Sequence, residues 1–271
     1  MVLREMQTRN YSKRSIDTYL HMLNCLEEHH NLPANEISIS QVKDFLQESI
    51  EKKKVSVSYI NQVISAVKIL QKDVLGKEWE AIRIKRPRRM KNLPVVLSKE
   101  EVKSIIDVTG NLKHRAILAL TYSAGLRISE VINLQPSDID SHRKQIRILG
   151  KGNKYRYTLL ADNVLSMLRT YWKAYRPIKY LFEGHIKGQP VSVTTVRVIF
   201  RNALKKAAIS KDASVHSLRH SFATHLLESG VNLKVIQSLL GHSSLRTTSI
   251  YLHVTRFDPA SIKSPFDEIA C

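Results

Sequence analysis

The segment LLGHSSLRTTSIYLHV, residues 239–254, limits what the chain can be more than any other stretch. Its tyrosine, Tyr251, lies between Ile250 and Leu252, and His242 comes nine positions earlier. A tyrosine in a helix of this kind is usually a half-buried aromatic, and Ile250 and Leu252 are expected to anchor the helix. A tyrosine hydroxyl can also act as a nucleophile. The segment alone therefore leaves two interpretations, packing and catalysis.

The composition indicates a folded chain with an anionic partner. Among 271 residues, 43% are hydrophobic, enough for a sizeable core, and chains of this length commonly form two domains. The 43 Lys and Arg against 24 Asp and Glu give a net charge of +19. Such a charge attracts polyanions, so nucleic acid is the first partner to test and an anionic membrane the second. The charge also opposes self-association, and the free protein is expected to be a monomer or weak oligomer.

Neither a membrane span nor a metal site is expected. The sequence has no run of about 18 apolar residues, and its amino terminus has no apolar core of the signal-peptide kind, so a cytoplasmic protein is predicted. The two cysteines, Cys25 and Cys271, are too few for a structural zinc cluster or a disulfide framework. Reduced thiols and no cofactor are predicted.

The first part of the chain, residues 1–82, is predicted to be a small all-helical domain. Apolar residues recur at helical spacing over Ser12–Glu28, Ser40–Ile50 and Val57–Leu75, and polar turns separate these segments.

A basic linker is predicted at residues 83–97. Pro87 and Pro94 disfavour helix there, so the segment should be extended. A solvated charged linker is one interpretation, and contact with a DNA backbone is the favoured one. The linker residues expected to bind DNA are Arg83, Lys85, Arg86, Arg88, Arg89 and Lys91.

A second domain, residues 98–255, is predicted to be mainly α with a small antiparallel β-sheet. Ser98 and Glu101 form a capping-box pattern at its start. In KQIRILGKGNKYRYTLL, residues 144–160, two alternating runs flank a glycine turn, which predicts a β-hairpin with Lys151 at its tip. The predicted helices cover residues 98–107, 112–124, 162–175, 194–208, 215–229, 232–240 and 244–255.

The predicted helix at 194–208 carries a basic stripe. Arg197, Arg201 and Lys205 recur every four residues opposite an apolar face, and the helix contains no acid. A solvated face is one interpretation of this stripe, and phosphate contact is the other.

Several further residues have side chains suited to a phosphate. Arg127 directly follows a helix that ends in Ala-Gly, although an ion pair with Glu130 would also account for it. Lys151 would be an ordinary exposed turn lysine without its context. His216 and Arg219, at i and i+3, project from one face of a helix.

A zinc site at His216, His220 and His225 is disfavoured. The pair at 216 and 220 lacks the glutamate of an H-E-x-x-H motif, and no cysteine lies nearby.

Together these groups would form a clamp for a phosphodiester. Guanidinium groups bind nonbridging oxygens bidentately and stabilise the added charge of a pentacoordinate transition state. No carboxylate cluster in the sequence indicates a magnesium site, so a protein nucleophile is favoured, and Tyr251 is a candidate. A lysine or a histidine can protonate the leaving oxygen, and a histidine can accept the tyrosyl proton.

The motifs AGLRISEV, LGKGNKYR, HSLRHSFATHLLESG and LLGHSSLRTTSIYLHV, in this order, resemble the catalytic domain of the tyrosine recombinases of the phage-integrase and Xer type. The resemblance covers residues 98 to about 255. The helical residues 1–82 resemble the family's SAM-like core-binding domain more loosely.

The resemblance implies roles for six catalytic positions. Arg127 and Arg219 would clamp the scissile phosphate, and Lys151 would be the general acid toward the 5′ oxygen. His216 would assist proton transfer, and His242 would hydrogen-bond the phosphate. Tyr251 would attack to give a 3′-phosphotyrosyl link. In addition, Glu130 would orient the site.

The resemblance also implies how the protein acts on double-stranded DNA. It predicts a two-domain clamp around the duplex and a homotetramer on synapsed sites, without the extra arm-binding domain of larger phage integrases. The tail, residues 256–271, would pack either on a neighbouring protomer or on its own domain. The expected function is site-specific recombination in integration, excision or dimer resolution. The alternatives are relaxation of DNA by a type IB topoisomerase and a DNA-binding regulator without catalysis.

Overall fold

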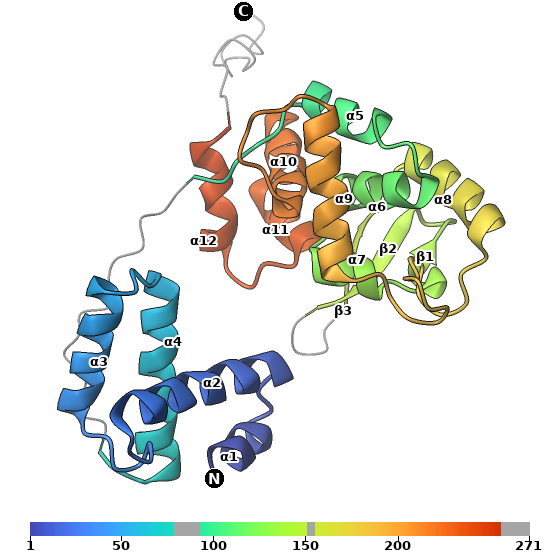
Figure 1. Cartoon of the computed structure of the whole chain (residues 1–271). Coiled ribbons are helices and arrows are strands. Elements are labelled where there is room, and N and C mark those ends of the chain that lie inside the picture. The colour runs from blue at the N-terminus through green and yellow to red at the C-terminus, as the bar shows by residue number, and fades with distance from the viewer. Residues whose placement is uncertain (79–92, 151–154, 256–271) are drawn as a thin grey trace, which may run out of the picture. The chain divides into compact units, whose positions relative to one another are not determined.

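The computed structural model describes residues 1–78, 93–150 and 155–255, which belong to two compact units, Met1–Lys91 and Asn92–Cys271 (Figure 1). Each unit buries its own apolar core. None of the helices within the described ranges is long and apolar enough to cross a membrane.

Within residues 1–78 the first unit is all-helical, and serine caps begin its three longest α-helices. The hydroxyls of Ser12, Ser38 and Ser56 each accept a backbone N–H from three residues further on. Leu26, Phe45 and Val63 are at most 1% exposed and lie in its core. The helices are α1 (Val2–Thr8), α2 (Lys13–His30), α3 (Ile39–Glu51), α4 (Val57–Lys68) and the π-helical η1 (Ile69–Val74).

Two features of this unit differ from the sequence-based expectation. Helix α1 was not predicted, because Met6 is its single buried residue and gives no apolar period. The predicted single helix Val57–Leu75 is α-helical to Lys68 and continues as the π-helical η1. Apolar periodicity cannot distinguish these windings, since Ile69 and Leu70 are buried in either.

The second unit is mainly helical and contains a small sheet of order β1-β2-β3, in which each neighbouring pair is antiparallel (Figure 1). Its elements are α5 (Lys99–Asp107), α6 (Leu112–Ser123), α7 (Ile128–Asn133), η2 (Pro136–Asp138), β1 (Ile139–Asp140), β2 (Gln145–Leu149), β3 (Tyr155–Leu159), α8 (Asp162–Tyr175), α9 (Val193–Lys206), α10 (Val215–Glu228), α11 (Leu233–Leu240), α12 (Leu245–Thr248) and η3 (Ser249–His253).

Helix α6 is the centre of this unit. All six residues 116–121 are buried, so the helix is enclosed on every side, and α5, α8, α9 and α10 pack against it. A helical segment that is buried all round lies inside a domain, and α6 is therefore the element against which its neighbours pack.

The capping box of Ser98 and Glu101 is confirmed, and so is the hairpin, in which Gln145 pairs with Leu159 and Leu149 with Tyr155. Short elements escaped prediction: α7 and β1 are too short for a periodic signal. The predicted helix at 244–255 is wrong in its second half, because α12 ends at Thr248 and the 3₁₀-helical η3 follows. Ser249, whose hydroxyl donates to the carbonyl of Arg246, lies where the winding changes.

Gly125 ends α6 in a conformation that only glycine adopts easily. Its φ is +60°, and a Cβ at this position would overlap the ring of Phe222 on α10. The tight turn brings the carbonyl of Gly125 against α10, where the candidate site lies.

Gly125→Ala should lower the free energy of unfolding by roughly 2 kcal/mol or more, since positive φ and core overlap each cost an alanine about 1 kcal/mol or more. Urea unfolding checks this. Gly110→Ala is the matched control, because no atom lies within 4 Å of its Cβ position. Equal stability of the two variants would contradict the assigned turn.

Candidate active site

Arg219 is a buried cation held by two helix ends. Its side chain is 4% exposed, and it donates from Nη1 to the carbonyl of Gly125 at 2.7 Å and from Nη2 to that of Leu240 at 2.6 Å. These carbonyls lie at the C-terminal ends of α6 and α11, where helix dipoles favour positive charge. Burial and the charge of Arg127 lower the pKa of Arg219 to about 10, so the guanidinium still stays charged at neutral pH.

Glu130 is a buried carboxylate shared by three arginines. Arg156 of β3 donates to both of its oxygens, at 3.0 and 2.9 Å, and Arg127 Nη1 lies 2.9 Å from Oε1. Arg219 Nη1 lies 3.6 Å from Oε2. The sequence R-I-S-E explains this geometry locally, since Glu130 on the first turn of α7 reaches back to accept the backbone N–H of Arg127 at 2.7 Å.

The electrostatic balance of this group favours an anion. Burial alone would raise the pKa of Glu130, but the charge of Arg156 and the Arg127 amide hold it below its ordinary value. One carboxylate thus opposes three guanidiniums. Arg127 remains 37% exposed, whereas Arg156 is 10% and Arg219 4% exposed, so Arg127 is the arginine that solvent reaches most easily.

His242, which follows the C-cap Gly241 of α11, is a neutral imidazole with both nitrogens engaged. Arg219 Nη2 lies 3.1 Å from Nε2, and Thr248 Oγ1 lies 3.0 Å from Nδ1. Because a guanidinium can only donate, Nε2 accepts and the hydrogen is assigned to Nδ1. Burial, Arg219 and Arg127 lower the pKa of His242 to about 4, consistent with this tautomer.

Tyr251 in η3 is both a core residue and a polar one. Its side chain is 1% exposed in a small cluster with Phe222, Ile236 and Leu240. Its hydroxyl lies 3.1 Å from Nδ1 of His220. Burial raises the pKa of Tyr251, against the opposing charges of Arg219 and Arg127, so the phenol is protonated at neutral pH. Leu252 is 55% exposed, so the expectation that it anchors the helix is wrong: the tyrosine ring itself does so.

His216 lies on the first turn of α10, on the same face as Arg219, and it is exposed. Surrounding protein and nearby guanidiniums, first that of Arg219, lower its pKa. The charge of Arg197, the first cation of the basic stripe of α9, also contributes to this shift. Arg197, Arg201 and Lys205 are all exposed.

Several candidates lie outside the described residues. They are Lys151 at the hairpin tip, the tail 256–271 and the linker residues Arg83, Lys85, Arg86, Arg88, Arg89 and Lys91.

Two residues of the site were not anticipated. Arg156 points inward from β3, between the exposed Tyr155 and Tyr157, and an arginine on the inner face of an alternating strand was the available signal. Its Nε also donates to the carbonyl of Leu239. His220 was considered as a zinc ligand alone, and its contact with Tyr251 spans 31 residues of sequence.

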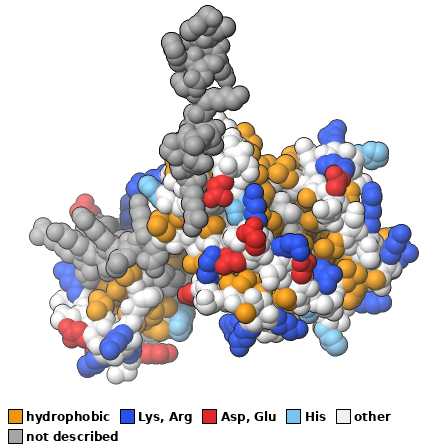
Figure 2. Space-filling model, turned by 90° about the horizontal axis from the view of Figure 1, so that it is seen from above, with side chains coloured by type: hydrophobic (Ala, Val, Ile, Leu, Met, Phe, Trp, Pro, Cys, Tyr) orange, Lys and Arg blue, Asp and Glu red, His pale blue; other side chains and the backbone are white. Residues whose placement is uncertain are grey.

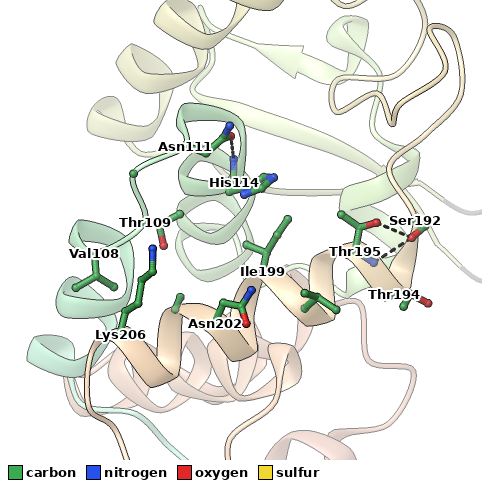
Figure 3. Close-up of a pocket in the computed structure, with 13 residues that line it drawn as sticks. Val108, Thr109, Asn111, His114, Ser192, Thr194, Thr195, Ile199, Asn202 and Lys206 are labelled. Carbon is green, nitrogen blue, oxygen red and sulfur yellow. Dashed lines mark hydrogen bonds between the residues drawn. The ribbon is translucent and has the colours of Figure 1, made fainter.

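The site is distinct from a hollow between the α5–α6 turn and α9 (Figure 3). Thr109, Asn111, His114, Asn202 and Lys206 line that hollow, and none of the arginines around Glu130 does. On the face in Figure 2, Lys and Arg side chains are spread over the larger unit with Asp and Glu among them, so no single patch identifies a partner.

The chain is similar to known proteins over both units. Residues 95–256 match the phage integrase family, and residues 1–81 match the N-terminal SAM-like domain of phage integrases. A tyrosine recombinase of Thermosipho africanus is 40% identical over 200 residues, 72% of this chain and 70% of that protein. Tyrosine recombinase XerA of Pyrococcus horikoshii is 37% identical over 210 residues, 76% of this chain and 73% of that protein.

The fold is also similar to a solved structure. The XerH site-specific recombinase bound to palindromic difH substrate in a post-cleavage complex has a TM-score of 0.74 at 22% identity, over 93% of this chain and 80% of that one.

Glu130→Gln should lower the free energy of unfolding by roughly 3 kcal/mol, because it leaves buried guanidiniums without their counter-charge. Since the folded pKa of Glu130 is lowered, its stabilisation is present above the unfolded carboxyl pKa and is lost as pH falls through the folded pKa. The difference from wild type should therefore be largest near neutral pH and shrink in acid.

Urea unfolding at a series of pH values measures this difference. Asp107→Asn, which breaks an exposed pair with Lys103, is the control and should change stability little at any pH. A Glu130→Gln effect that is as small, or that does not depend on pH, would refute the buried charge network.

Proposed function

The chain belongs to the phage integrase family and is a tyrosine-type site-specific recombinase, which cleaves and rejoins DNA through a 3′-phosphotyrosyl intermediate; from this premise we propose which of its residues perform the reaction. The proposal assigns catalysis to Arg127, Lys151, His216, Arg219, His242 and Tyr251, with Glu130 in support. The observation that carries it is the buried carboxylate of Glu130 among three guanidiniums, two of which, Arg219 and Arg127, act electrostatically on the Tyr251 hydroxyl.

The excess positive charge is the physical basis of the phosphate clamp. Arg219 uses Nη1 and Nη2 on two helix-end carbonyls, which fixes the plane of its guanidinium before any substrate arrives. Arg127 is held by Glu130 and stays partly exposed. A scissile phosphate would bind between these groups, and charge fixed in advance stabilises the pentacoordinate transition state without reorganisation.

Covalent cleavage then follows in one displacement. The oxygen of Tyr251 attacks the phosphorus, the bond to the 5′ oxygen breaks, and the 3′ end stays attached to the tyrosine. Lys151 would protonate the departing 5′ oxygen, and His216 would assist proton transfer. His242 would hydrogen-bond the phosphate, for which Nε2 must leave Arg219. Because the phosphotyrosine retains the ester bond, attack by a 5′ hydroxyl religates the strand without ATP.

The burial of Tyr251 requires a movement before cleavage. A phosphate cannot reach a side chain that is 1% exposed, so some of the residues that cover Tyr251 must move when DNA binds. Two kinds of contact hold Tyr251 of η3 in place: its ring packs in a cluster of five buried residues, and its hydroxyl has a histidine partner.

DNA contact outside the active site is proposed for the basic stripe of α9. Its three cations are exposed and recur every four residues along one face of α9, and the charge of the first, Arg197, lowers the pKa of His216. The linker cations at 83–91 would follow the phosphate backbone as well. Residues 1–82 would be the core-binding domain, 83–97 the linker and 98–255 the catalytic domain.

We also propose an oligomeric state, a cellular location and a biological task for the protein. The active form would be a homotetramer on two synapsed duplexes, in the cytoplasm, with the tail 256–271 packed on a neighbouring protomer or on its own domain. Its task would be integration or excision of a mobile element, or dimer resolution. The relatives named above are recombinases, which favours this function over topoisomerase activity or regulation without catalysis.

Tyr251→Phe should abolish the covalent adduct while leaving DNA affinity nearly unchanged, because it removes only the nucleophilic oxygen. The substrate is a nicked suicide duplex, built on the attachment site that wild-type protein marks on genomic DNA. Tyr122→Phe is the matched control, since Tyr122 also bonds a histidine of α10 at 2.9 Å but lies outside the arginine cluster. An adduct formed by Tyr251→Phe would move the nucleophile elsewhere.

Arg201→Ala should reduce the slope of log affinity against log salt concentration by about 1, as expected for one lost phosphate contact. Fluorescence anisotropy on a random-sequence duplex measures the slope. Lys103→Ala removes an exposed cation of α5 and serves as the control. Identical slopes for the two variants would remove α9 from the DNA interface.

A further inference from the structure

The hydroxyl of Tyr251 has a partner outside the six catalytic positions. His220, on the second turn of α10, places Nδ1 3.1 Å from this hydroxyl, with the two ring centroids 5.8 Å apart. We propose that His220 is a catalytic residue, which accepts the proton of Tyr251 during cleavage and returns it during religation. This inference rests on the proposed function of Tyr251 as the nucleophile.

The geometry favours His220 over the other two histidines of the site. His242 has both nitrogens engaged, by Arg219 and Thr248. His216 is exposed, and its side chain makes no hydrogen bond within the part of the chain that the structure describes. Since His216 and His220 are four residues apart, they share a face of α10, but η3 packs against this helix with its tyrosine at His220.

His220 has the protonation state that a base needs. Burial, His216 and Arg219 lower its pKa to about 4, so the imidazole is neutral at physiological pH. The charged and titratable groups around it are His216 and Arg219 on α10, His242 after α11 and Tyr251 in η3. In the proposed state Nδ1 accepts the phenolic hydrogen and Nε2 carries the ring hydrogen.

A bound phosphate would raise the proton affinity of the His220 imidazole. Arg127 and Arg219 disfavour nearby positive charge, and Arg219 is one cause of the low pKa of His220. A phosphodiester between the two guanidiniums opposes that effect with its own negative charge, which raises the proton affinity of the imidazole. The guanidiniums of Arg219 and Arg127 favour the phenolate form of Tyr251, which helps its proton to leave.

The proton and electron balance of the step is complete. A lone pair of the Tyr251 oxygen forms the O–P bond, and the phenolic proton moves to Nδ1 of His220. The P–O5′ bond breaks with its electron pair on the 5′ oxygen, which takes a proton from the general acid, proposed to be Lys151. During religation each proton returns along the same path.

The test is the single-turnover rate of adduct formation on the nicked suicide duplex, with binding measured separately. His220→Asn keeps an acceptor near the position of Nδ1 but cannot take a proton, and it should slow cleavage by about 100-fold or more at unchanged affinity. His225→Asn is the matched control, since it alters the other histidine–tyrosine pair of α10 and should cleave at nearly the wild-type rate. Thermal unfolding curves, measured for every variant, check that each one is folded at the assay temperature.

A second substrate separates a base from a structural role. With sulfur in place of the bridging 5′ oxygen, the leaving thiolate needs no proton, so Lys151→Ala should recover while His220→Asn stays slow. Added imidazole should restore part of the rate of His220→Ala. Wild-type cleavage by His220→Asn, or its recovery on the sulfur substrate, would overturn the inference. No adduct from the wild-type protein would instead overturn the proposed function on which the inference rests.

Discussion

One buried carboxylate organises the catalytic unit. Glu130 accepts hydrogen bonds from Arg127 and from both terminal nitrogens of Arg156, and it lies 3.6 Å from Arg219. Removing a charge from water is costly, so the loss of any one partner would leave the remaining charges buried without compensation. The arginines come from the start of α7, from β3 and from α10, and the carboxylate therefore ties three separate elements to one point. The excess of positive charge at that point is what a phosphate can neutralise.

The nucleophile depends on the same framework. Arg219 donates hydrogen bonds to the carbonyls of Gly125 and Leu240, which holds the ends of α6 and α11 in place. Leu240 also belongs to the apolar cluster in which Tyr251 packs. A phenol that is buried and neutral is unreactive, which suits an enzyme that must not break DNA until its site is complete. Binding energy from the basic surfaces would then be used to uncover Tyr251, whose proton His220 would accept.

The sequence predicted what depends on local chemistry and missed what depends on tertiary contacts. Ser98 with Glu101, and the alternating runs around the glycine turn, indicated a capped helix and a hairpin because their signals are local. The 3₁₀ winding at Tyr251 has no periodic signature. Arg156 and His220 reach partners 26 and 31 residues away, Glu130 and Tyr251, and spacing along a chain does not reveal such contacts. Motif resemblance named the reacting groups, whereas the structure supplied the partners that hold them.

The central claim is that the oxygen of Tyr251 forms the bond to DNA within the arginine cluster of Glu130. The most direct measurement is mass spectrometry of the covalent protein–DNA complex, digested with protease and nuclease. The account predicts one modified peptide, spanning Tyr251 and carrying a 3′-linked nucleotide on that residue. A nucleotide on any other side chain, or at the 5′ end of the cleaved strand, would contradict it.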